Sequence, residues 1–414
     1  MITIGSRGDV QPIVALGMGL RDAGYSVRIV TLDSFKDMVL DNGLDFWPVR
    51  GDAQQIVQEM MVRHGANTNF LQMYKGVMRS FGGIVDDYIE AFSNEALQDS
   101  DAILSQLPGN FFGYDMAEAL GVPYIALSVI PQERTAAYPI ALLPNRFSPG
   151  RWWNRLSYGI ATQLAWRPFY GPINRFRGQL GLMKTPFLWG NTRKDVPVLQ
   201  GFSEHVVPTE AEWGERVRTT GYWVLDEPEW EPSPELTQFL EAGSPPIYIG
   251  FGSMPVPDPR QTTQLILKAL AESKQRTVLS AGWARLGREE LPEHIFLLDY
   301  APHSWLFPKM GGIVHHGGTG TTGAALRSGV PSVVIPFTVD QPFWSERSRA
   351  LGVGPAPIPF QKLTATKLAK TIRQLLKDES MRKNAVQLCD RMAAEDGVGK
   401  AVGIIQDMLN KANK

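Results

Sequence analysis

The stretch that decides the fold is Ile313-Val314-His315-His316-Gly317-Gly318-Thr319-Gly320-Thr321-Thr322-Gly323-Ala324-Ala325-Leu326. An apolar run ends at Val314, four glycines follow within seven residues, and an apolar helical segment begins at Ala324. Gly329-Val330-Pro331 stops that segment, because glycine and proline both disfavour a continuing helix. The pattern predicts a strand, a glycine loop and a helix that begins inside the loop.

A helix that begins in a glycine loop is suited to bind a diphosphate. Its first amides are unpaired and lie at the positive end of the helix dipole, and Gly318 and Gly320 let a ligand approach the backbone closely. Thr319 and Thr321 add hydroxyl donors, and a ring N–H of His316 can donate to an ionised phosphate oxygen. No lysine follows the glycines, so the loop is not of the Walker A type. The alternative is a tight turn that serves packing alone.

The segment that follows extends the pattern. After a second apolar run, Val333-Val334-Ile335, the sequence continues to Asp340-Gln341-Pro342. The whole of residues 315–347, HHGGTGTTGAALRSGVPSVVIPFTVDQPFWSER, resembles the donor-binding signature of UDP-dependent glycosyltransferases of the GT-B fold. Its form is similar to that of sterol 3-beta-glucosyltransferases and the related antibiotic glycosyltransferases.

Four further motifs occur in the family's order, so the resemblance covers nearly the whole chain. They are GSRGDVQP at residues 5–12, GFSEHVVP at 201–208, TGYW at 220–223 and GFGSMP at 250–255. The resemblance implies an α/β protein of the GT-B fold, with two Rossmann-like domains facing each other across a cleft. We expect an acceptor-binding domain at residues 1–212, a domain at 213–393 that binds the UDP-sugar, and a helix at 394–414 that returns to the first domain.

The composition is that of an ordinary globular protein. A chain of 414 residues is long for one domain. Since 41 Lys and Arg stand against 42 Asp and Glu, the net charge of −1 gives no indication of a nucleic-acid surface. The single Cys389 excludes an internal disulfide and fits a reducing compartment. No signal peptide precedes residue 20 and no apolar run approaches the roughly 20 residues that span a bilayer, so we expect a cytoplasmic protein.

Asp9 lies in the loop that follows an apolar strand at Met1–Ile4. As a structural residue it would cap the helix that Pro12 opens. The resemblance implies a catalytic role, because in GSRGDVQP-type members this aspartate receives the proton of the acceptor hydroxyl. No histidine occurs in the loop, so Asp9 is the predicted base. His64 is the alternative base or a partner of Asp9, and its structural alternative is a surface position.

Further donor contacts are expected where other C-terminal strands end. Ser253 can donate to a phosphate, with an ordinary turn as the alternative. Trp283 can stack on uracil, with core packing as the alternative. Ala301 and His303 are candidates to bind the base through main-chain amide and carbonyl groups.

Asp340 and Gln341 come directly before a helix that Pro342 opens. A carboxylate and an amide can hold sugar hydroxyls, and Gln341 favours glucose as the donor sugar. Both residues can also cap the helix, and the two roles are compatible.

The N-terminal domain has apolar and aromatic side chains that suit a hydrophobic acceptor. The candidates are Phe70, Met73, Phe111, Phe112 and Tyr138. Resemblance suggests a sterol, and macrolide, glycopeptide, flavonoid and glycolipid acceptors are the alternatives.

Aromatic residues and arginines alternate between residues 147 and 187. Examples are Arg151-Trp152-Trp153, Trp166-Arg167 and Arg175-Phe176-Arg177. One interpretation is a face for peripheral membrane contact, through which a lipid acceptor is taken up. The other is a helical hairpin whose aromatic residues pack onto the domain while its arginines are solvated.

The resemblance implies an inverting transfer of glucose from UDP-glucose, a co-substrate, to an acceptor hydroxyl such as a sterol 3-hydroxyl. No cofactor is required, and no carboxylate cluster suited to a divalent metal is evident. A non-catalytic lipid-binding module on the same fold is the rival class. The presence of both Asp9 and the donor loop argues against that rival.

Overall fold

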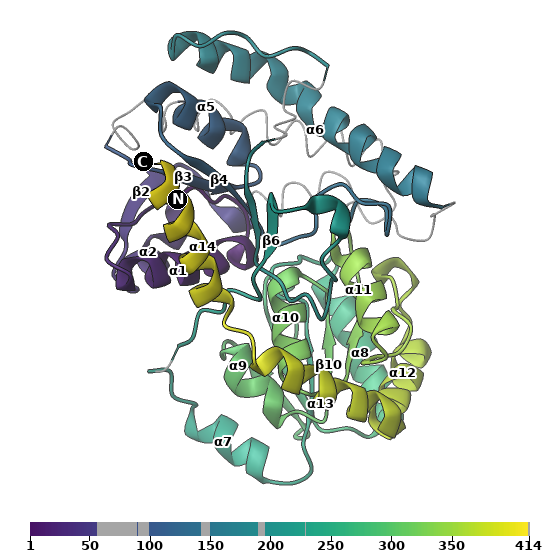
Figure 1. Cartoon of the computed structure of the whole chain (residues 1–414). Coiled ribbons are helices and arrows are strands. Elements are labelled where there is room, and N and C mark those ends of the chain that lie inside the picture. The colour runs from purple at the N-terminus through teal and green to yellow at the C-terminus, as the bar shows by residue number, and fades with distance from the viewer. Residues whose placement is uncertain (56–88, 90–98, 142–149, 189–194, 228, 413–414) are drawn as a thin grey trace. The chain divides into compact units, whose positions relative to one another are not determined.

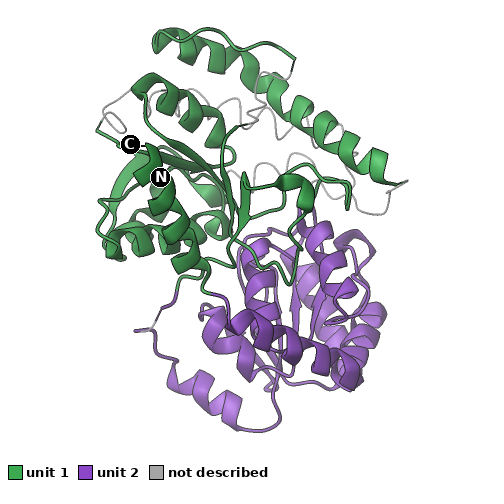
Figure 2. Cartoon of the chain, viewed as in Figure 1, with its two compact units in different colours: residues 1–225, 396–414 green, residues 226–395 purple. Residues whose placement is uncertain are grey.

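The computed structural model of the chain describes residues 1–55, 89, 99–141, 150–188, 195–227 and 229–412. The chain forms two compact units (Figure 2). Unit 1 comprises residues 1–225 and 396–414, and unit 2 comprises residues 226–395.

Unit 1 is built on parallel strands. The strands are β1 (Arg28–Leu32), β2 (Asp45–Val49), β3 (Ile103–Gln106), β4 (Tyr124–Ser128), β5 (Val198–Gln200) and β6 (Val217–Thr219). The helices are α1 (Arg7–Asp22), α2 (Lys36–Leu40), α5 (Asn110–Leu120), α6 (Arg151–Gln179) and α14 (Gly397–Ala412) (Figure 1). The strand order is β3-β4-β5-β6, beside a parallel pair β1-β2.

Ile2 joins the two groups of strands in unit 1. It forms parallel bridges to Val30 of β1 and to Ser105 of β3, and its side chain is fully buried. The predicted strand at Met1–Ile4 is therefore reduced to one bridging residue. The chain then turns at Gly5 into α1, as the sequence predicts for a Rossmann-like unit.

Unit 1 extends further along the chain than the predicted boundary after residue 212. The reason is that β6 pairs with β5, so it completes the sheet of unit 1. The indole of Trp223 is buried and its Nε1 donates to Thr220 Oγ1 over 2.9 Å. The chain returns to unit 1 at Asp396, and α14 packs on α1, where Gly19 faces Val398.

Unit 2 has a five-stranded parallel sheet in the order β11-β10-β7-β8-β9. The strands are β7 (Ile247–Gly250), β8 (Thr277–Ser280), β9 (Ile295–Leu298), β10 (Gly312–His315) and β11 (Ser332–Val334). The helices are α7 (Pro234–Glu241), α8 (Pro259–Ser273), α9 (His303–Leu306), α10 (Thr319–Arg327), α11 (Gln341–Ala350), α12 (Ala365–Lys377) and α13 (Glu379–Ala393). On one side of the sheet α8 packs against α12, and on the other α10 packs against α9 and α13 (Figure 1).

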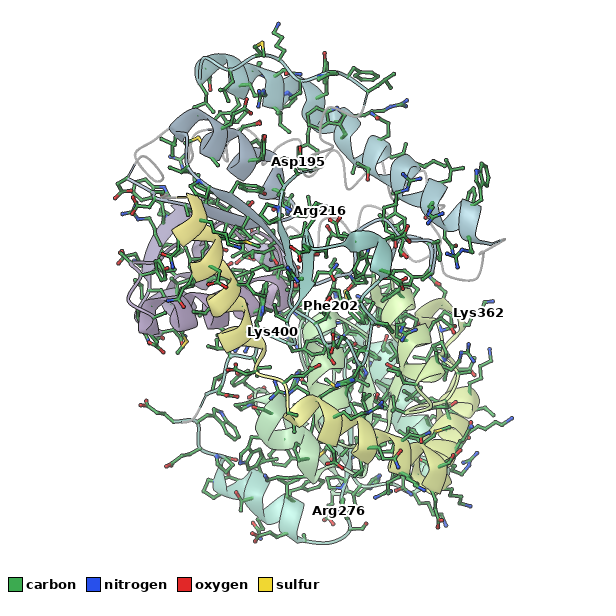
Figure 3. All side chains as sticks on the ribbon, viewed as in Figure 1. Asp195, Phe202, Arg216, Arg276, Lys362 and Lys400 are labelled. Carbon is green, nitrogen blue, oxygen red and sulfur yellow. The ribbon has the colours of Figure 1, made fainter. Side chains whose placement is uncertain are left out.

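The strand order of unit 2 reverses between β7 and β10. From β7 the chain adds β8 and β9 on one side, and then crosses to add β10 and β11 on the other. In open parallel sheets a ligand binds outside the carboxyl ends of the strands at such a reversal. At the amino end of β8 the chain makes a structural contact instead: the guanidinium of Arg276, labelled in Figure 3, lies 4.5 Å from the ring centroid of Phe239 in α7.

The segment from residue 151 to 179 is one helix rather than the hairpin that the sequence suggests. Pro168 and Pro172 lie inside α6 without ending it. Trp166, Phe169 and other aromatic side chains of α6 pack inward, as the packing interpretation expects. Arg177 contradicts the expectation of solvated arginines, because its side chain is only 5% exposed.

Arg177 ties α6 to α5 through two carboxylates. Its Nη1 donates to Asp115 over 2.5 Å and to Glu118 over 2.8 Å. Burial would lower the pKa of the Arg177 guanidinium, but the hydrogen bonds and charges of Glu118 and Asp115 outweigh burial and raise it. The side chain of Asp115 is itself buried, so both charges of this pair depend on each other.

We expect Arg177→Ala to lower the free energy of unfolding by about 3–5 kcal/mol, because it leaves the Asp115 carboxylate buried without its cation. Urea denaturation followed by far-UV circular dichroism measures the change. Arg349→Ala is the matched control, since Arg349 forms an exposed pair with Glu346 that contributes less than about 1 kcal/mol. Equal effects of the two substitutions would contradict the structural role of Arg177.

Candidate active site

All the predicted donor residues lie at the carboxyl edge of the unit 2 sheet. Because the five strands are parallel, the segments that follow them emerge at the same edge. These segments are residues 251–253 after β7, 281–283 after β8, 299–303 after β9, 316–321 after β10 and 335–341 after β11. The sequence therefore predicted a set of positions that the sheet brings to one place.

The imidazole of His316 lies between two glycines at the point where the strand order reverses. A Cβ on Gly252 would lie 2.8 Å from His316 Cε1, and a Cβ on Gly318 would lie 2.5 Å from His316 Nε2. A third glycine, Gly317, has φ +91°, and a Cβ there would lie 2.5 Å from Val334 Cγ1. Only glycine fits at these three positions while the His316 ring and Val334 stay in place.

His315 orders the same loop from inside the sheet. It is fully buried at the end of β10, and its Nδ1 accepts a hydrogen bond from the Gly317 amide over 3.2 Å. The proton of the neutral ring is thereby assigned to Nε2. Sequence reasoning named His316 as a ligand-binding residue but gave His315 no role of its own.

Both histidines are neutral in the folded protein. Burial, with the neighbouring His303 as the second cause, lowers the pKa of His316 to about 3. Burial also holds the pKa of His315 well below its ordinary value, and His316 and His303 add to the effect. The buried Nδ1 of His316 and Nε2 of His315 have no hydrogen-bond partner among the described residues. Buried polar atoms of this kind are uncommon and are consistent with a ligand site.

The N-terminus of α10 offers unpaired amides beside these histidines. Gly318 is the N-cap residue and provides no side-chain cap, and the first amide bonded to it is that of Thr322, over 2.8 Å. The amides of Thr319, Gly320 and Thr321 come before the first helical hydrogen bond. Such a terminus attracts an anionic group.

Asp340 is hydrogen-bonded to this helix. Its Oδ2 accepts from Thr319 Oγ1 over 2.9 Å and from Trp344 Nε1 over 2.8 Å. Burial raises the pKa of the Asp340 carboxyl, and the bonds from Thr319 and Trp344 act in the opposite direction. Asp340 is the N-cap residue of α11 but makes no side-chain capping bond, so capping does not account for its carboxylate.

Gln341 stabilises the turn before α11. Its Oε1 accepts from the amides of Phe337, over 2.7 Å, and Thr338, over 3.2 Å. Inside this turn Val339 has φ +58°, a conformation that is strained for a β-branched residue. Strain of this kind persists only where the surrounding bonds enforce it, and it is often found at functional sites.

The loops after β7 and β8 are tied together. The amide of Trp283 donates to the carbonyl of Gly252 over 3.0 Å, and a Cβ on Gly282 would lie 2.8 Å from the same carbonyl oxygen. The indole of Trp283 is half-buried, and in the described part of the chain no aromatic ring packs against it. Ser253 is also half-buried, one residue beyond Gly252.

The segment after β9 is more tightly packed. Ala301 is buried, and the ring of His303 stacks on Phe307 with centroids 4.3 Å apart. Tyr248 packs at a steep angle against both rings, with its centroid 5.8 Å from that of His303 and 4.9 Å from that of Phe307. Packing therefore occupies the His303 ring and leaves main-chain contacts as the role to be tested for these two residues.

Asp9 lies in the first turn of α1 in unit 1. Its Oδ2 accepts from the amide of Ser6 over 2.8 Å and from Ser6 Oγ over 3.0 Å. Ser6 is the N-cap residue, so the capping role expected of Asp9 takes the form of a capping box. Gly5 is required here, because a Cβ would lie 2.3 Å from Asp9 Oδ2.

The main chain of Asp9 is fixed by two residues that sequence reasoning missed. Its carbonyl accepts from Gln106 Nε2 over 2.7 Å and from Thr3 Oγ1 over 3.2 Å. Gln106 also donates to Thr3 over 2.6 Å. A polar residue at the end of a buried strand was the only sequence signal for Gln106.

The acceptor candidates differ in their surroundings. Phe112 is fully buried against Phe176 of α6, so it is a core residue rather than an acceptor contact. Phe111 is half-buried and stacks on Phe169 at 4.6 Å, and Tyr138 is half-buried in the loop after β4. The other candidates lie outside the described residues: His64, Phe70 and Met73.

Two absences hold for the residues that the structure describes. Within ranges 1–55, 99–141, 150–188, 195–227 and 229–412, no group of three or more His, Cys, Asp or Glu is arranged to hold a metal ion. None of the described helices is long and apolar enough to span a bilayer.

We expect Gly317→Ala to raise the dissociation constant of UDP about tenfold or more, because the added Cβ displaces Val334 or the loop on which the amides of α10 depend. Isothermal titration calorimetry measures the affinity. Gly403→Ala, at a helical glycine with open space around it, is the control and leaves UDP affinity unchanged. Unaltered UDP binding by Gly317→Ala would rule out a site that depends on this loop.

The neutral His316 predicts a pH dependence of stability. In the unfolded chain a histidine binds a proton below a pKa of about 6.5, whereas the folded His316 binds one only near pH 3. The unfolded state therefore holds more protons between these values, and stability falls as the pH falls. Between pH 7.5 and 5 one such ring accounts for a loss of about 2 kcal/mol.

We expect His316→Asn to reduce that pH-dependent loss by about 2 kcal/mol, in urea denaturation curves recorded at both pH values. His294→Asn, at an exposed histidine, is the control and keeps the full loss. A His316→Asn protein with the same pH dependence as the parent would show that His316 is not buried as a neutral ring.

Comparison with known proteins identifies two family domains. Residues 1–139 match the glycosyltransferase family 28 N-terminal domain, and residues 264–408 match the erythromycin biosynthesis protein CIII-like C-terminal domain. A sterol 3-beta-glucosyltransferase of Arabidopsis thaliana, UGT80A2, is 37% identical over 97% of this chain and 64% of its own length. Fungal proteins of the same name are similar, and the chain spans 34% of the protein from Vanderwaltozyma polyspora. The chain thus spans less than two thirds of these curated relatives.

Solved structures agree on the fold. CalG4, the calicheamicin glycosyltransferase, superposes with a TM-score of 0.72 at 18% identity, over 99% of this chain and 97% of that one. The glycosyltransferase VinC, in complex with DTDP, gives a TM-score of 0.66 at 18% identity over 99% of both chains. The predicted α/β fold with two Rossmann-like domains is confirmed. The chain therefore contains a glycosyltransferase family 28 N-terminal domain and an erythromycin biosynthesis protein CIII-like C-terminal domain, shares its fold with antibiotic glycosyltransferases, and is similar to sterol 3-beta-glucosyltransferases.

Proposed function

We propose that the chain transfers glucose from UDP-glucose to the 3-hydroxyl of a sterol or steroid, with inversion at the anomeric carbon. The observation that carries the proposal is the His316 ring held between Gly252 and Gly318, beside the uncapped start of α10. The names of the relatives, sterol 3-beta-glucosyltransferases, support the acceptor class. We also propose that the protein acts in a reducing compartment, as expected from its single cysteine.

We assign the donor to unit 2. The diphosphate would accept hydrogen bonds from the first amides of α10, from the hydroxyls of Thr319 and Thr321, and from Ser253. His316 would add a ring N–H. Because the ring is neutral, the strength of that bond comes from the ionised phosphate oxygen. The half-buried indole of Trp283 offers a flat apolar face for uracil.

The sugar is assigned to Asp340 and Gln341. The carboxylate of Asp340 retains acceptor capacity beside the bonds from Thr319 and Trp344. The Oε1 of Gln341 is used within its own turn, so its Nε2 is the group available for a sugar hydroxyl. These two residues support glucose as the donor sugar.

The reaction needs one proton acceptor and one stabilised leaving group. The acceptor oxygen forms a bond to C1 of glucose, the bond from C1 to the diphosphate oxygen breaks, and UDP takes the electron pair. Negative charge that develops on the diphosphate is stabilised by the α10 amides and His316. We assign the acceptor proton to the carboxylate of Asp9, which accepts it late, as the bond to C1 forms.

The antibiotic glycosyltransferases among the similar structures support a second candidate acceptor. CalG4 is a calicheamicin glycosyltransferase with nearly complete coverage of this chain. The same donor site and Asp9 would then act on a macrolide or another hydrophobic natural product, and a flavonoid, glycopeptide or glycolipid remains in this class. Phe111 and Tyr138 are the described residues that we assign to the acceptor in either case.

We expect Asp9→Asn to lower kcat by about a hundredfold or more, because the amide cannot take the acceptor proton. UDP affinity should stay within a fewfold, since Asp9 belongs to unit 1. The measurement is mass-spectrometric detection of hexose transfer from UDP-glucose to a panel of sterols, macrolides and flavonoids, with water alone as the blank. Asp22→Asn, at an exposed position on the same helix, is the control and keeps full activity.

Each outcome of this assay decides one part of the proposal. Hexose transfer to a sterol that Asp9→Asn abolishes would support the whole scheme. UDP binding without transfer to any panel member would remove the sterol assignment and leave the donor site standing. Full activity of Asp9→Asn would eliminate Asp9 as the base, and His64 or a water molecule would then be the candidate proton acceptor.

A further inference from the structure

The outer face of α6 exposes a row of large apolar side chains. Trp152, Leu156 and Ile160 are 76%, 36% and 40% exposed. They are spaced by four residues, so they form one stripe along the first turns of the helix. Figure 1 shows α6 on the outside of α5, away from β3 and β4. A contiguous exposed apolar stripe on a soluble fold marks an interaction surface.

The chain segment after α6 extends this stripe. Gln163 Nε2 and Trp166 Nε1, further along the helix, both donate to the carbonyl of Phe187 over 3.1 Å. The ring of Phe187 packs edge-on against Tyr170 at 5.1 Å. Phe187 and Leu188 are nevertheless 46% and 58% exposed. Hydrogen bonds therefore hold two more apolar side chains at the continuation of the same helical face.

The segment that carries this stripe contains basic residues and no acidic ones. From residue 150 to 188 the sequence contains six Arg and Lys and no Asp or Glu. Arg155 and Arg177 pair with acidic residues from other parts of unit 1. The other four basic side chains of the segment are exposed: Arg151, Arg167, Arg175 and Lys184. Exposed apolar side chains on a segment with exposed basic groups complement a surface with an apolar interior and anionic head groups.

The inner face of α6 holds the loop that follows β4. Asn154 Nδ2 donates to the carbonyl of Ala136 over 2.9 Å, and Ser157 Oγ accepts from the Ile140 amide over 3.0 Å. Glu212, paired with Arg155, accepts from the Ala136 amide over 2.7 Å. The helix thus has one face directed to solvent and the opposite face bonded to the loop that contains Tyr138.

We propose that the α6 surface docks on a lipid bilayer that contains anionic phospholipids. This surface is defined by the apolar residues Trp152, Leu156, Ile160, Phe187 and Leu188 and the basic residues Arg151, Arg167, Arg175 and Lys184. The indole of Trp152 enters the interfacial region, and the basic groups contact the head groups. Docking places the loop after β4 about one helix diameter, ~10 Å, from the bilayer, with α6 between them, a consequence that matters if the proposed transfer to a lipid-soluble acceptor holds.

The test is co-sedimentation of the full chain with vesicles of phosphatidylcholine alone or with about a third phosphatidylserine. The apolar variant carries Trp152→Gln, Leu156→Gln and Ile160→Gln. The basic variant carries Arg151→Gln, Arg167→Gln and Lys184→Gln. We expect each variant to lower the partition onto anionic vesicles about tenfold or more, and the parent chain to bind neutral vesicles weakly.

Matched controls alter similar side chains elsewhere. Leu40→Gln with Val386→Gln removes two other exposed apolar residues, and Lys268→Gln with Lys370→Gln removes two exposed basic residues of unit 2. Both controls should bind anionic vesicles as the parent does. Far-UV circular dichroism and thermal melting confirm that each variant is folded.

A second measurement does not depend on a loss of binding. The chain has one cysteine, so Cys389→Ser with Ile160→Cys places a polarity-sensitive fluorophore on the α6 surface. Its emission should shift to the blue with anionic vesicles, whereas the same label at Leu40→Cys should not shift.

Three outcomes would overturn the proposal. These are failure of the parent to bind anionic vesicles, equal binding to neutral ones, and parent-like binding by the apolar variant. If the apolar variant bound vesicles as the parent does but differed from the parent in molar mass by light scattering, the surface would be assigned to contact with a second copy of the chain. Since vesicle binding needs no sugar transfer, none of these outcomes depends on the proposed reaction, which is measured separately with detergent-solubilised sterol.

Discussion

The packing of the His316 imidazole between Gly252 and Gly318 is the constraint on which the unit 2 site depends. The ring occupies the space where a Cβ on either glycine would lie, so the loops after β7 and β10 meet only because both residues lack a side chain. This contact sits where the strand order reverses, and the start of α10 follows it directly. A ligand phosphate can therefore meet backbone amides, a threonine hydroxyl and an imidazole within one short stretch of chain.

Polar bonds around this contact hold the rest of the site in place. His315 binds the Gly317 amide from inside the sheet, and Asp340 connects α10 to α11 through Thr319 and Trp344. Burial raises the free-energy cost of leaving any of these groups unpaired, so the network resists rearrangement. The positive φ of Val339 is maintained by the same bonds, because Gln341 fixes the two amides before it.

The two units use a similar turn before one of their helices, α1 in unit 1 and α10 in unit 2. In unit 1 the chain turns at Gly5, and the Asp9 carboxylate closes over the start of α1. In unit 2 it turns at Gly317, and the His315 ring binds the loop before α10. A glycine with positive φ and a polar side chain bonded to a nearby amide form each turn. In unit 1 this leaves a carboxylate at a helix N-terminus, a position that favours its negative charge.

The sequence by itself determined the strand, glycine loop and helix within residues 313–326, the strand ends that carry the donor candidates, and the glycines of the turns. These features depend on neighbours in the chain, since backbone conformation and apolar periodicity are local. Two strands, β2 and β6, were not predicted from the sequence, and only their pairing with β1 and β5 identifies them as strands. Only the tertiary structure decided that Phe112 is core, that Arg177 is buried against Asp115, 62 residues away, and that α6 continues through two prolines. Burial and charge pairing are properties of residues distant in sequence, and folding alone brings them together.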